Sequence, residues 1–280
     1  KGIVKCWGGS ENEAAVPADL KGVTTIQAAS YHTCAATKET VRCWGKPEEE
    51  KSYADTPENL KNVIKIGTNS ENTCALTSDR KIYCWGNKEE QVARVPRDLI
   101  KPFQIATADS HTCALSENRL DCWGDNSNYR SRDLKNPKSM CTGREQTCAI
   151  TDNGVECWAQ FAKVPPLTNP RQIACGDTHV CALDDSGVSC WGDGNDYGQT
   201  TVPLNLKNPR WIATGPKASC VADDDGIKCW GLNRSGNLSI PRDIPLLSGP
   251  SAFGMATDET CAMTENGLRC WGKHGPGFVR

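Results

Sequence analysis

The sequence lacks the features that mark several large classes of protein. Its 280 residues contain no apolar run close to the roughly 20 residues that span a bilayer, so we expect no membrane insertion. The formal net charge is only −2, so no global basic field attracts nucleic acid. No phosphate loop, nucleophile–base pair or carboxylate pair can be located. We therefore expect no enzyme and no cofactor, while noting that a site assembled from several loops leaves no such motif.

Metal-binding signatures are missing as well, although the chain has 17 cysteines. Zinc sites use C-x2-4-C pairs or mixed Cys/His clusters, whereas the paired cysteines here have eight or nine residues between them and no matching histidine. The runs "DDSG" and "DDDG" do not follow the spacing of a calcium loop and are typical of hairpin turns. We expect structural disulfides and no metal, which indicates a secreted, periplasmic or cell-surface protein.

What the chain does contain is one phrase, repeated. "TCAITDNGVECW" returns as "TCAATKETVRCWG", "TCALTSDRKIYCWG", "TCALSENRLDCWG", "VCALDDSGVSCWG", "SCVADDDGIKCWG" and "TCAMTENGLRCWG". An eighth "CWG" stands near the start, in "GIVKCWGG". The second cysteines are Cys6, Cys43, Cys84, Cys122, Cys157, Cys190, Cys229 and Cys270. A period of this length is typical of a propeller or a solenoid.

Each repeat predicts a β-hairpin closed by a disulfide. Cys148 and Cys157 become directly opposed if the turn holds two or four residues, and Gly154 supplies the positive φ that such a turn needs. Opposed cysteines at a non-hydrogen-bonded position meet disulfide geometry. The second pair has one extra residue, which predicts a bulge or an odd loop. The predicted bridges are Cys34–Cys43, Cys74–Cys84, Cys113–Cys122, Cys148–Cys157, Cys181–Cys190, Cys220–Cys229 and Cys261–Cys270.

Three cysteines fall outside this pattern. Cys141 and Cys175 lie in the short strands that precede two successive hairpins, and a bridge between them is plausible. Cys6 then stays free or joins a group elsewhere, because the total of 17 is odd.

Apolar residues on both faces of each hairpin predict sheets stacked against copies of themselves. Seven hairpins predict an all-β fold, a seven-bladed β-propeller of short antiparallel blades with one hairpin disulfide per repeat. We expect a single domain over 1–280, with repeats ending near 45, 86, 124, 159, 192, 231 and 272. Residues 2–8 either add a closing strand or belong to a longer array. The "CW" tryptophans should pack between blades, and His32, His111 and His179 should serve structural hydrogen bonds.

The segments "AAVPADLKGVTTIQAASYHTCA" and "WGDGNDYGQTTVP" resemble the regulator-of-chromosome-condensation-like propellers. The pattern is closest to that of the propeller-type β-lactamase inhibitor proteins, and the resemblance covers nearly the whole chain. It implies a seven-bladed propeller that binds partners with one rim. In the inhibitors that rim is rich in aromatic residues. Of the two rim positions before the histidine of each repeat, only Tyr31 is aromatic in this sequence.

These observations predict a non-enzymatic, secreted or surface-displayed propeller that recognises an extracellular protein through the loops of one rim. The alternative is a lectin or adhesin module that binds glycans, using also Asn126, Asn195 and Asn233. The candidate binding residues precede the second strand of a repeat or follow its tryptophan: Tyr31, Glu71, Asp109, Arg144, Asp125, Tyr129, Asp177, Asp193, Tyr197, Lys217 and Asp258.

Overall fold

The structure is a computed structural model, in which strands and loops make up all of the described residues. It describes residues 20, 22–28, 32–45, 56–69, 72–86, 94–124, 131–144, 146–159, 163–193, 195–233, 236, 238–240, 253–255, 259–264, 267–272 and 277–278. No helix in these ranges has the length and hydropathy that a membrane span requires. The contacts divide the chain into two compact units, residues 1–137 and 138–280.

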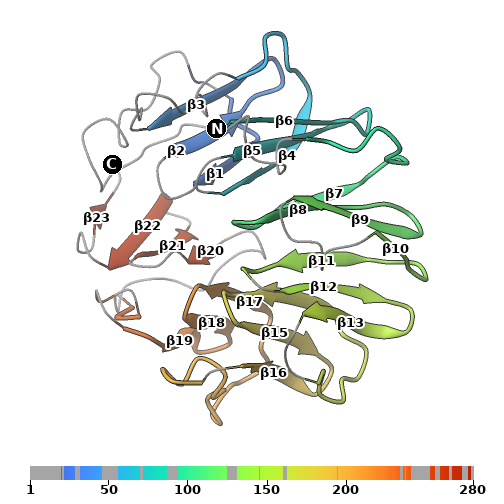
Figure 1. The fold of residues 1–280 in the computed structure, drawn as a ribbon. Coiled ribbons are helices and arrows are strands. Elements are labelled where there is room, and N and C mark those ends of the chain that lie inside the picture. The colour runs from blue at the N-terminus through green and yellow to red at the C-terminus, as the bar shows by residue number, and fades with distance from the viewer. Residues whose placement is uncertain are drawn as a thin grey trace. The chain divides into compact units, whose positions relative to one another are not determined.

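Within the first unit, the described residues form three antiparallel sheets that follow one another along the chain (Figure 1). Their orders are β1-β2-β3, β4-β5-β6 and β10-β9-β8-β7. The strands are β1 (Thr25–Ala28), β2 (His32–Ala36), β3 (Val41–Gly45), β4 (Val63–Thr68), β5 (Asn72–Thr77), β6 (Ile82–Gly86), β7 (Gln104–Thr107), β8 (His111–Leu115), β9 (Arg119–Gly124) and β10 (Arg132–Asp133).

Within the second unit, the described residues form four antiparallel sheets, β11-β12-β13, β14-β15-β16, β17-β18-β19 and β20-β21-β22-β23. The first three sheets use β11 (Ser139–Thr142), β12 (Gln146–Thr151), β13 (Gly154–Ala159), β14 (Gln172–Cys175), β15 (His179–Asp184), β16 (Gly187–Gly192), β17 (Trp211–Gly215), β18 (Ala218–Asp223) and β19 (Gly226–Gly231). The fourth uses β20 (Phe253–Met255), β21 (Glu259–Thr264), β22 (Gly267–Gly272) and β23 (Gly277–Phe278).

In the repeats whose burial is described, the second strand is the most deeply buried element. Every described residue of β5, β8, β12, β15 and β18 is buried. These strands lie in the middle of their sheets, and their side chains are buried on both faces, as apolar residues on both faces predicted. The first strands of successive sheets lie beside one another, β1 by β4 and β4 by β7 in the first unit, and β11 by β14 and β14 by β17 in the second.

The predicted hairpin disulfides are confirmed at six sites in the described part of the chain. In the fourth repeat Cys148 lies opposite Cys157, and Thr151 opposite Gly154, which leaves a two-residue turn. Gly154 has the expected positive φ, 103°. The extra residue of the second repeat widens its hairpin to a loop of residues 78–80, in which Arg80 has a φ of 67°.

Two further cysteine predictions have different outcomes. Cys141 and Cys175 form a bridge between the first strands of two successive sheets in the second unit. The backbone register places Cys261 opposite Cys270, but the side chains of β21 and β22 lie outside the described residues, as does the whole of segment 2–8 with Cys6.

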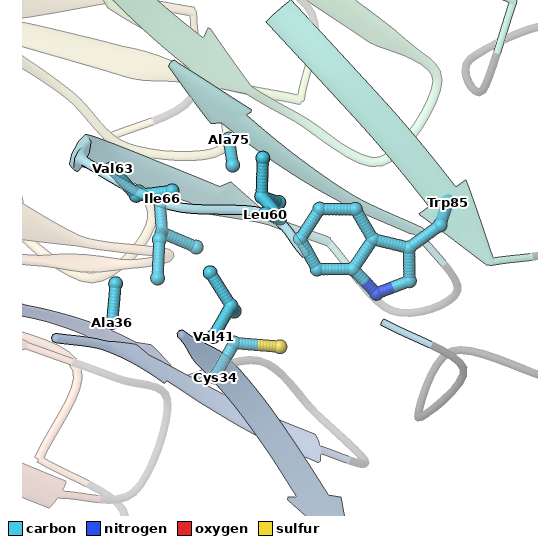
Figure 2. Close-up of a cluster of buried hydrophobic side chains, with 8 residues drawn as sticks. All are labelled: Cys34, Ala36, Val41, Leu60, Val63, Ile66, Ala75 and Trp85. Carbon is cyan, nitrogen blue, oxygen red and sulfur yellow. The ribbon is translucent and has the colours of Figure 1, made fainter. Parts of the chain in front are cut away.

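Successive sheets pack by placing the tryptophan of one on the disulfide of the preceding one. Trp85 of β6 is buried in a cluster with Cys34 and Val41 of the first sheet, and Cys43 packs against the same cluster. Figure 2 shows the indole ring beside Leu60, which comes from the crossover segment before β4. The same pairing recurs for Trp123 with Cys74, Trp191 with Cys148 and Trp230 with Cys181. Among the described residues these tryptophans therefore pack between sheets, as predicted.

Glycine is required after the tryptophan for a steric reason. Gly192 has a φ of 146°, and a Cβ there would collide with the carbonyl oxygen of Thr178 and with His179 Cα. Gly231 repeats the arrangement, since its Cβ would lie 2.6 Å from the carbonyl oxygen of Lys217. The turn before the second strand thus presses on the end of the third strand, and only glycine fits there.

We predict that Gly192→Ala destabilises the protein by about 3 kcal/mol or more, because the new methyl group adds a backbone collision to an unfavourable φ. Gly187→Ala is the matched control, since Gly187 begins the same strand with a φ of 126° and has nothing within 4 Å of its Cβ position. The control should lose only about 1–2 kcal/mol. Denaturant unfolding of the oxidised variants measures both, and equal losses would contradict the collision.

Peptide mapping of the unreduced protein tests the remaining bridge. Because the backbone register pairs Cys261 with Cys270 as it pairs the other hairpin cysteines, we expect a fragment that links these two residues. Free thiols at both positions, or a link from either to another repeat, would show that the last hairpin breaks the pattern.

Candidate functional site

The two ends of each sheet carry different turns. At the hairpin end, a turn joins the second strand to the third. At the other end, which we call the histidine end, the turn from the first strand to the second meets the end of the third strand. The pairing of His179 with Gly192 in the fifth repeat fixes this arrangement, so the loop that follows Gly192 leaves from the histidine end. The described candidate binding residues all belong to this end.

The described candidates are accessible to a partner. Asp109, Arg144, Asp193 and Lys217 are exposed, Asp177 is half-buried and Tyr197 is 41% exposed. The others fall outside the described residues: Tyr31, Glu71, Asp125, Tyr129 and Asp258.

Three of the candidates come together in the second unit. The Lys217 ammonium lies 5.1 Å from the centroid of the Tyr197 ring, within the range of a cation–π interaction. The backbone N–H of Asp177 donates to the carbonyl oxygen of Pro216 at 3.1 Å, which holds the turn after β14 against the turn before β18. We call Asp177, Tyr197 and Lys217 the rim patch. It offers an aromatic ring, a cation and an anion on neighbouring loops.

The loop that carries Tyr197 is closed by its own side chains. Asn195 Nδ2 donates to Thr201 Oγ1 at 2.8 Å, and Asn195 Oδ1 accepts from the Thr200 N–H at 2.9 Å. Gly198, next to the tyrosine, has a φ of 74°. An exposed loop held by internal hydrogen bonds loses less conformational entropy on binding. Tyr197 is therefore presented in a preorganised form.

The same loop is anchored on the next sheet through Gln199, which is buried. Its carbonyl oxygen accepts hydrogen bonds from Trp230 Nε1 at 2.9 Å and from Ser219 Oγ at 3.1 Å. Sequence reasoning missed Gln199 and Ser219 as anchors. The only available signal was the spacing of "W-G-x-N-x-x-G-Q" in "WGDGNDYGQ".

Asn195 and Asn233, two of the asparagines considered for glycan binding, make hydrogen bonds within their own loops. Asn233 occupies the corresponding position in the next repeat, where its Oδ1 accepts from the Leu238 N–H at 3.2 Å. Both side chains close their own loops, since carboxamides can bond to backbone groups a few residues away. Asn126, the third asparagine considered for glycans, lies outside the described residues.

The recurring histidines link adjacent sheets. His32 Nε2 lies 2.7 Å from Thr73 Oγ1, and His179 Nε2 lies 2.9 Å from Ser219 Oγ. Because the Ser219 hydroxyl donates its proton to Gln199, the His179 Nε2–H must be the donor in its own bond. Gln146 replaces histidine in the fourth repeat and donates to the carbonyl oxygens of Gly176 and His179. The predicted structural role is confirmed for His32 and His179.

Burial controls the ionisation of these histidines. It lowers the pKa of His32, His111 and His179 to about 4 from an ordinary value of 6.5. The imidazoles are therefore neutral at neutral pH. In the described ranges, no group of three His, Cys, Asp or Glu side chains is placed to hold a metal ion.

The acidic runs at the hairpin end bind their own hairpin and the crossover segment beside it. Asp184 accepts from the backbone N–H groups of Thr168 and Ser186, at 2.6 and 2.8 Å. Asp223 accepts from Lys228 Nζ at 2.7 Å and from the Lys207 N–H at 2.8 Å. Burial raises the pKa of Asp223, but these hydrogen bonds outweigh it, and the pKa lies below its ordinary value. The carboxylates thus stabilise turns, as predicted for hairpin residues.

Comparison with known proteins identifies the architecture. The family model for the regulator of chromosome condensation (RCC1) repeat matches residues 63–89 and 171–199. The structure is also similar to solved β-propellers of this type. The fold is that of an RCC1-like β-propeller. No curated protein matches the chain.

Three solved structures illustrate the likeness of the propeller. The CRINKLY WD40 ectodomain of the Arabidopsis thaliana receptor kinase ACR4 is 23% identical with a TM-score of 0.67, over 92% of this chain and 98% of that one. The entire ectodomain of the Physcomitrella patens receptor kinase CR4 is 20% identical with a TM-score of 0.68, over 90% and 74%. Prp20p of Saccharomyces cerevisiae, studied for its binding to Gsp1p and histones, is 19% identical with a TM-score of 0.61, over 77% and 73%.

The buried histidines predict that stability falls as the solution is acidified. With a folded pKa of about 4 and an unfolded value of 6.5, the unfolded chain binds the proton first between these pH values. Each such histidine should cost about 3 kcal/mol by pH 4. His179→Gln, which introduces the residue of the fourth repeat, should remove about that much of the pH dependence. Unfolding free energies of both proteins at pH 7 and pH 4 test this, and parallel curves would contradict it.

Proposed function

We propose that this chain is a non-enzymatic propeller, secreted or displayed at a cell surface, that binds a protein partner through the histidine end of its sheets. In this proposal the repeats form one seven-bladed ring over residues 1–280, and residues 2–8 contribute a closing strand. An inhibitor-like action on the partner is the finer form of the same proposal, and it follows from the resemblance to the β-lactamase inhibitor proteins.

The rim patch is the observation that carries the proposal. Tyr197 is a large aromatic side chain left exposed on a loop that its own hydrogen bonds hold in place. Tyr and Trp, together with Arg, dominate the energetic centres of protein interfaces. Lys217 on the ring and Asp177 beside it add charges of both signs, which favour one partner orientation over others.

The disulfides support an extracellular location. The described residues hold six hairpin bridges and the bridge between Cys141 and Cys175. Cytosolic reductants keep such thiols reduced, so a protein built around them is at home in an oxidising compartment. Two of the similar structures are receptor ectodomains, which agrees with this location.

A protein partner is preferred over a glycan at the histidine end. Glycan pockets need free carboxamide and carboxylate groups beside an aromatic ring, and the loops use Asn195 and Asn233 for their own closure. A patch of one aromatic and two charged side chains has the composition of a protein interface.

Binding assays with the oxidised chain test the proposal. Panels of extracellular protein domains, of β-lactamases and of glycans are screened, and each hit is titrated. We expect a protein to bind once per chain, and Tyr197→Ala to weaken it at least tenfold, because hot-spot truncation costs more than about 1.4 kcal/mol.

Asp185→Ala is the matched control, since Asp185 is 52% exposed at the hairpin end. It should leave the affinity unchanged. Binding only to glycans, with several equivalents per chain, would favour the lectin alternative. A protein partner that tolerates Tyr197→Ala would exclude the rim patch, and silence of the β-lactamase panel would exclude that inhibitor subtype.

A further inference from the structure

The second repeat departs from the others at its hairpin end. Its hairpin loop has three residues, 78–80, where the fourth repeat has a two-residue turn. The crossover before it contains Asn59 in a left-handed conformation, with a φ of 61°. Tyr83 stands directly before the second cysteine of the hairpin. At that position the other repeats have Arg42, Asp121, Glu156, Ser189, Lys228 and Arg269, so Tyr83 is the one aromatic residue in this set.

These departures meet at one place. A hollow of about 370 Å³ is lined by the crossover residues 57–62, the hairpin residues 77–79 and Tyr83. The Ser78 N–H donates to the carbonyl oxygen of Asn62 at 2.9 Å, which joins the two walls. The volume lies near the lower end of small-molecule sites, about 300–1,000 Å³, and suits a ligand about the size of one sugar ring.

The hairpin does not use Tyr83 as it uses the corresponding residues of other repeats. Glu156 accepts a hydrogen bond from Thr151 at 2.8 Å, and Lys228 binds Asp223 at 2.7 Å, so each stabilises its own turn. In the second repeat, Lys81 already pairs with the hairpin carboxylate Asp79 at 2.8 Å. Tyr83 is instead 39% exposed at the edge of the hollow.

The register of β5 and β6 shows on which face of the sheet Tyr83 lies. Tyr83 lies opposite Ala75, which belongs to the cluster formed with Trp85 and Leu60. Residues two apart on a strand share a face, so Tyr83 and Trp85 both point to the side covered by the crossover. Trp85 fills the core beneath Leu60, and Tyr83 continues the same face outward to the hollow (Figure 2 shows Trp85 and Leu60).

The lining has the chemistry of a saccharide site. The face of a tyrosine ring stacks on the apolar C–H face of a pyranose, while hydroxyl groups exchange hydrogen bonds with amides, carboxylates and ammonium groups. Glu58, Asn59 and Lys61 supply these groups on the crossover wall. The net charge is small, because Asp79 pairs with Lys81 and the Lys61 ammonium lies 3.5 Å from Glu39, which leaves three carboxylates, Glu58 included, against two ammonium groups. A lining of small net charge favours a neutral ligand over a strongly ionic one.

We propose that this hollow is a binding site for a neutral hexose unit of a glycan, with Tyr83 as the stacking platform. The site belongs to the hairpin end of the second repeat and is independent of the rim patch. The proposal goes beyond the recognition of a protein by the rim patch. The saccharide site is tested at Tyr83, and the rim patch is tested at Tyr197.

Tyrosine-selective NMR tests the proposal on the oxidised full chain. The chain has five tyrosines, so a sample labelled in the tyrosine rings gives few signals, and Tyr83→Phe assigns that of Tyr83 by its disappearance. Glucose, galactose, mannose, N-acetylglucosamine and fucose are titrated separately. We expect at least one sugar to shift the Tyr83 signal saturably, with a Kd of about 1 mM or weaker, as a single ring allows.

Two variants complete the experiment. Tyr83→Arg introduces the residue that the first repeat has at this position, so the sheet should fold, and sugar binding should weaken at least tenfold. Tyr197→Ala at the histidine end should bind the sugar as the unchanged protein does. The proposal is overturned if none of the five sugars shifts the Tyr83 signal, if Tyr83→Arg binds equally well, or if the sugar shifts Tyr197 instead. None of these results bears on whether a protein binds the rim patch.

Discussion

The structure depends on the contact between the disulfide of one sheet and the tryptophan of the next. A sheet of three short strands has too little area to enclose a core of its own, so each sheet needs a neighbour on each face. The disulfide holds the second and third strands of a sheet together, and the indole of the next sheet packs against it. The contact recurs within the described residues as Cys34 with Trp85, Cys74 with Trp123, Cys148 with Trp191 and Cys181 with Trp230.

Fixing the third strand also decides where the functional loops begin. In the fifth repeat, Trp191 is held in the core, and Gly192 must pass under the carbonyl oxygen of Thr178. The loop that follows is then tied to the next sheet, because Ser219 contacts both His179 and the carbonyl oxygen of Gln199. One buried hydroxyl therefore couples the packing between sheets to the display of Tyr197. The loop is therefore ordered in the free protein, so that binding a partner costs less conformational entropy.

Much of the regular structure was predictable because it depends on short-range geometry. The spacing of Cys148 and Cys157 and the position of Gly154 sufficed to predict the hairpin, its register and its bridge. The rim patch was only partly predictable. Tyr197 and Lys217 were both candidates, but their contact joins two loops of different sheets, and no local pattern encodes it. The loop closure by Asn195 was not predictable either, because carboxamides serve loop closure and ligand binding equally well. Tyr83 was not predicted as a binding residue, because the hollow that it borders forms only where the crossover and the hairpin meet in space.

The repeats themselves distinguish structural from functional positions. Where a shared backbone constraint exists, as at Gly192 and Gly231, the copies agree because no other residue fits. Where a side chain stabilises its own hairpin, the copies differ in identity but keep a polar group, as Glu156 and Lys228 do. Tyr83 follows neither rule: it departs from its set and stays exposed over a polar hollow. Because neither structural rule accounts for it, Tyr83 is the position to which the saccharide proposal assigns a ligand.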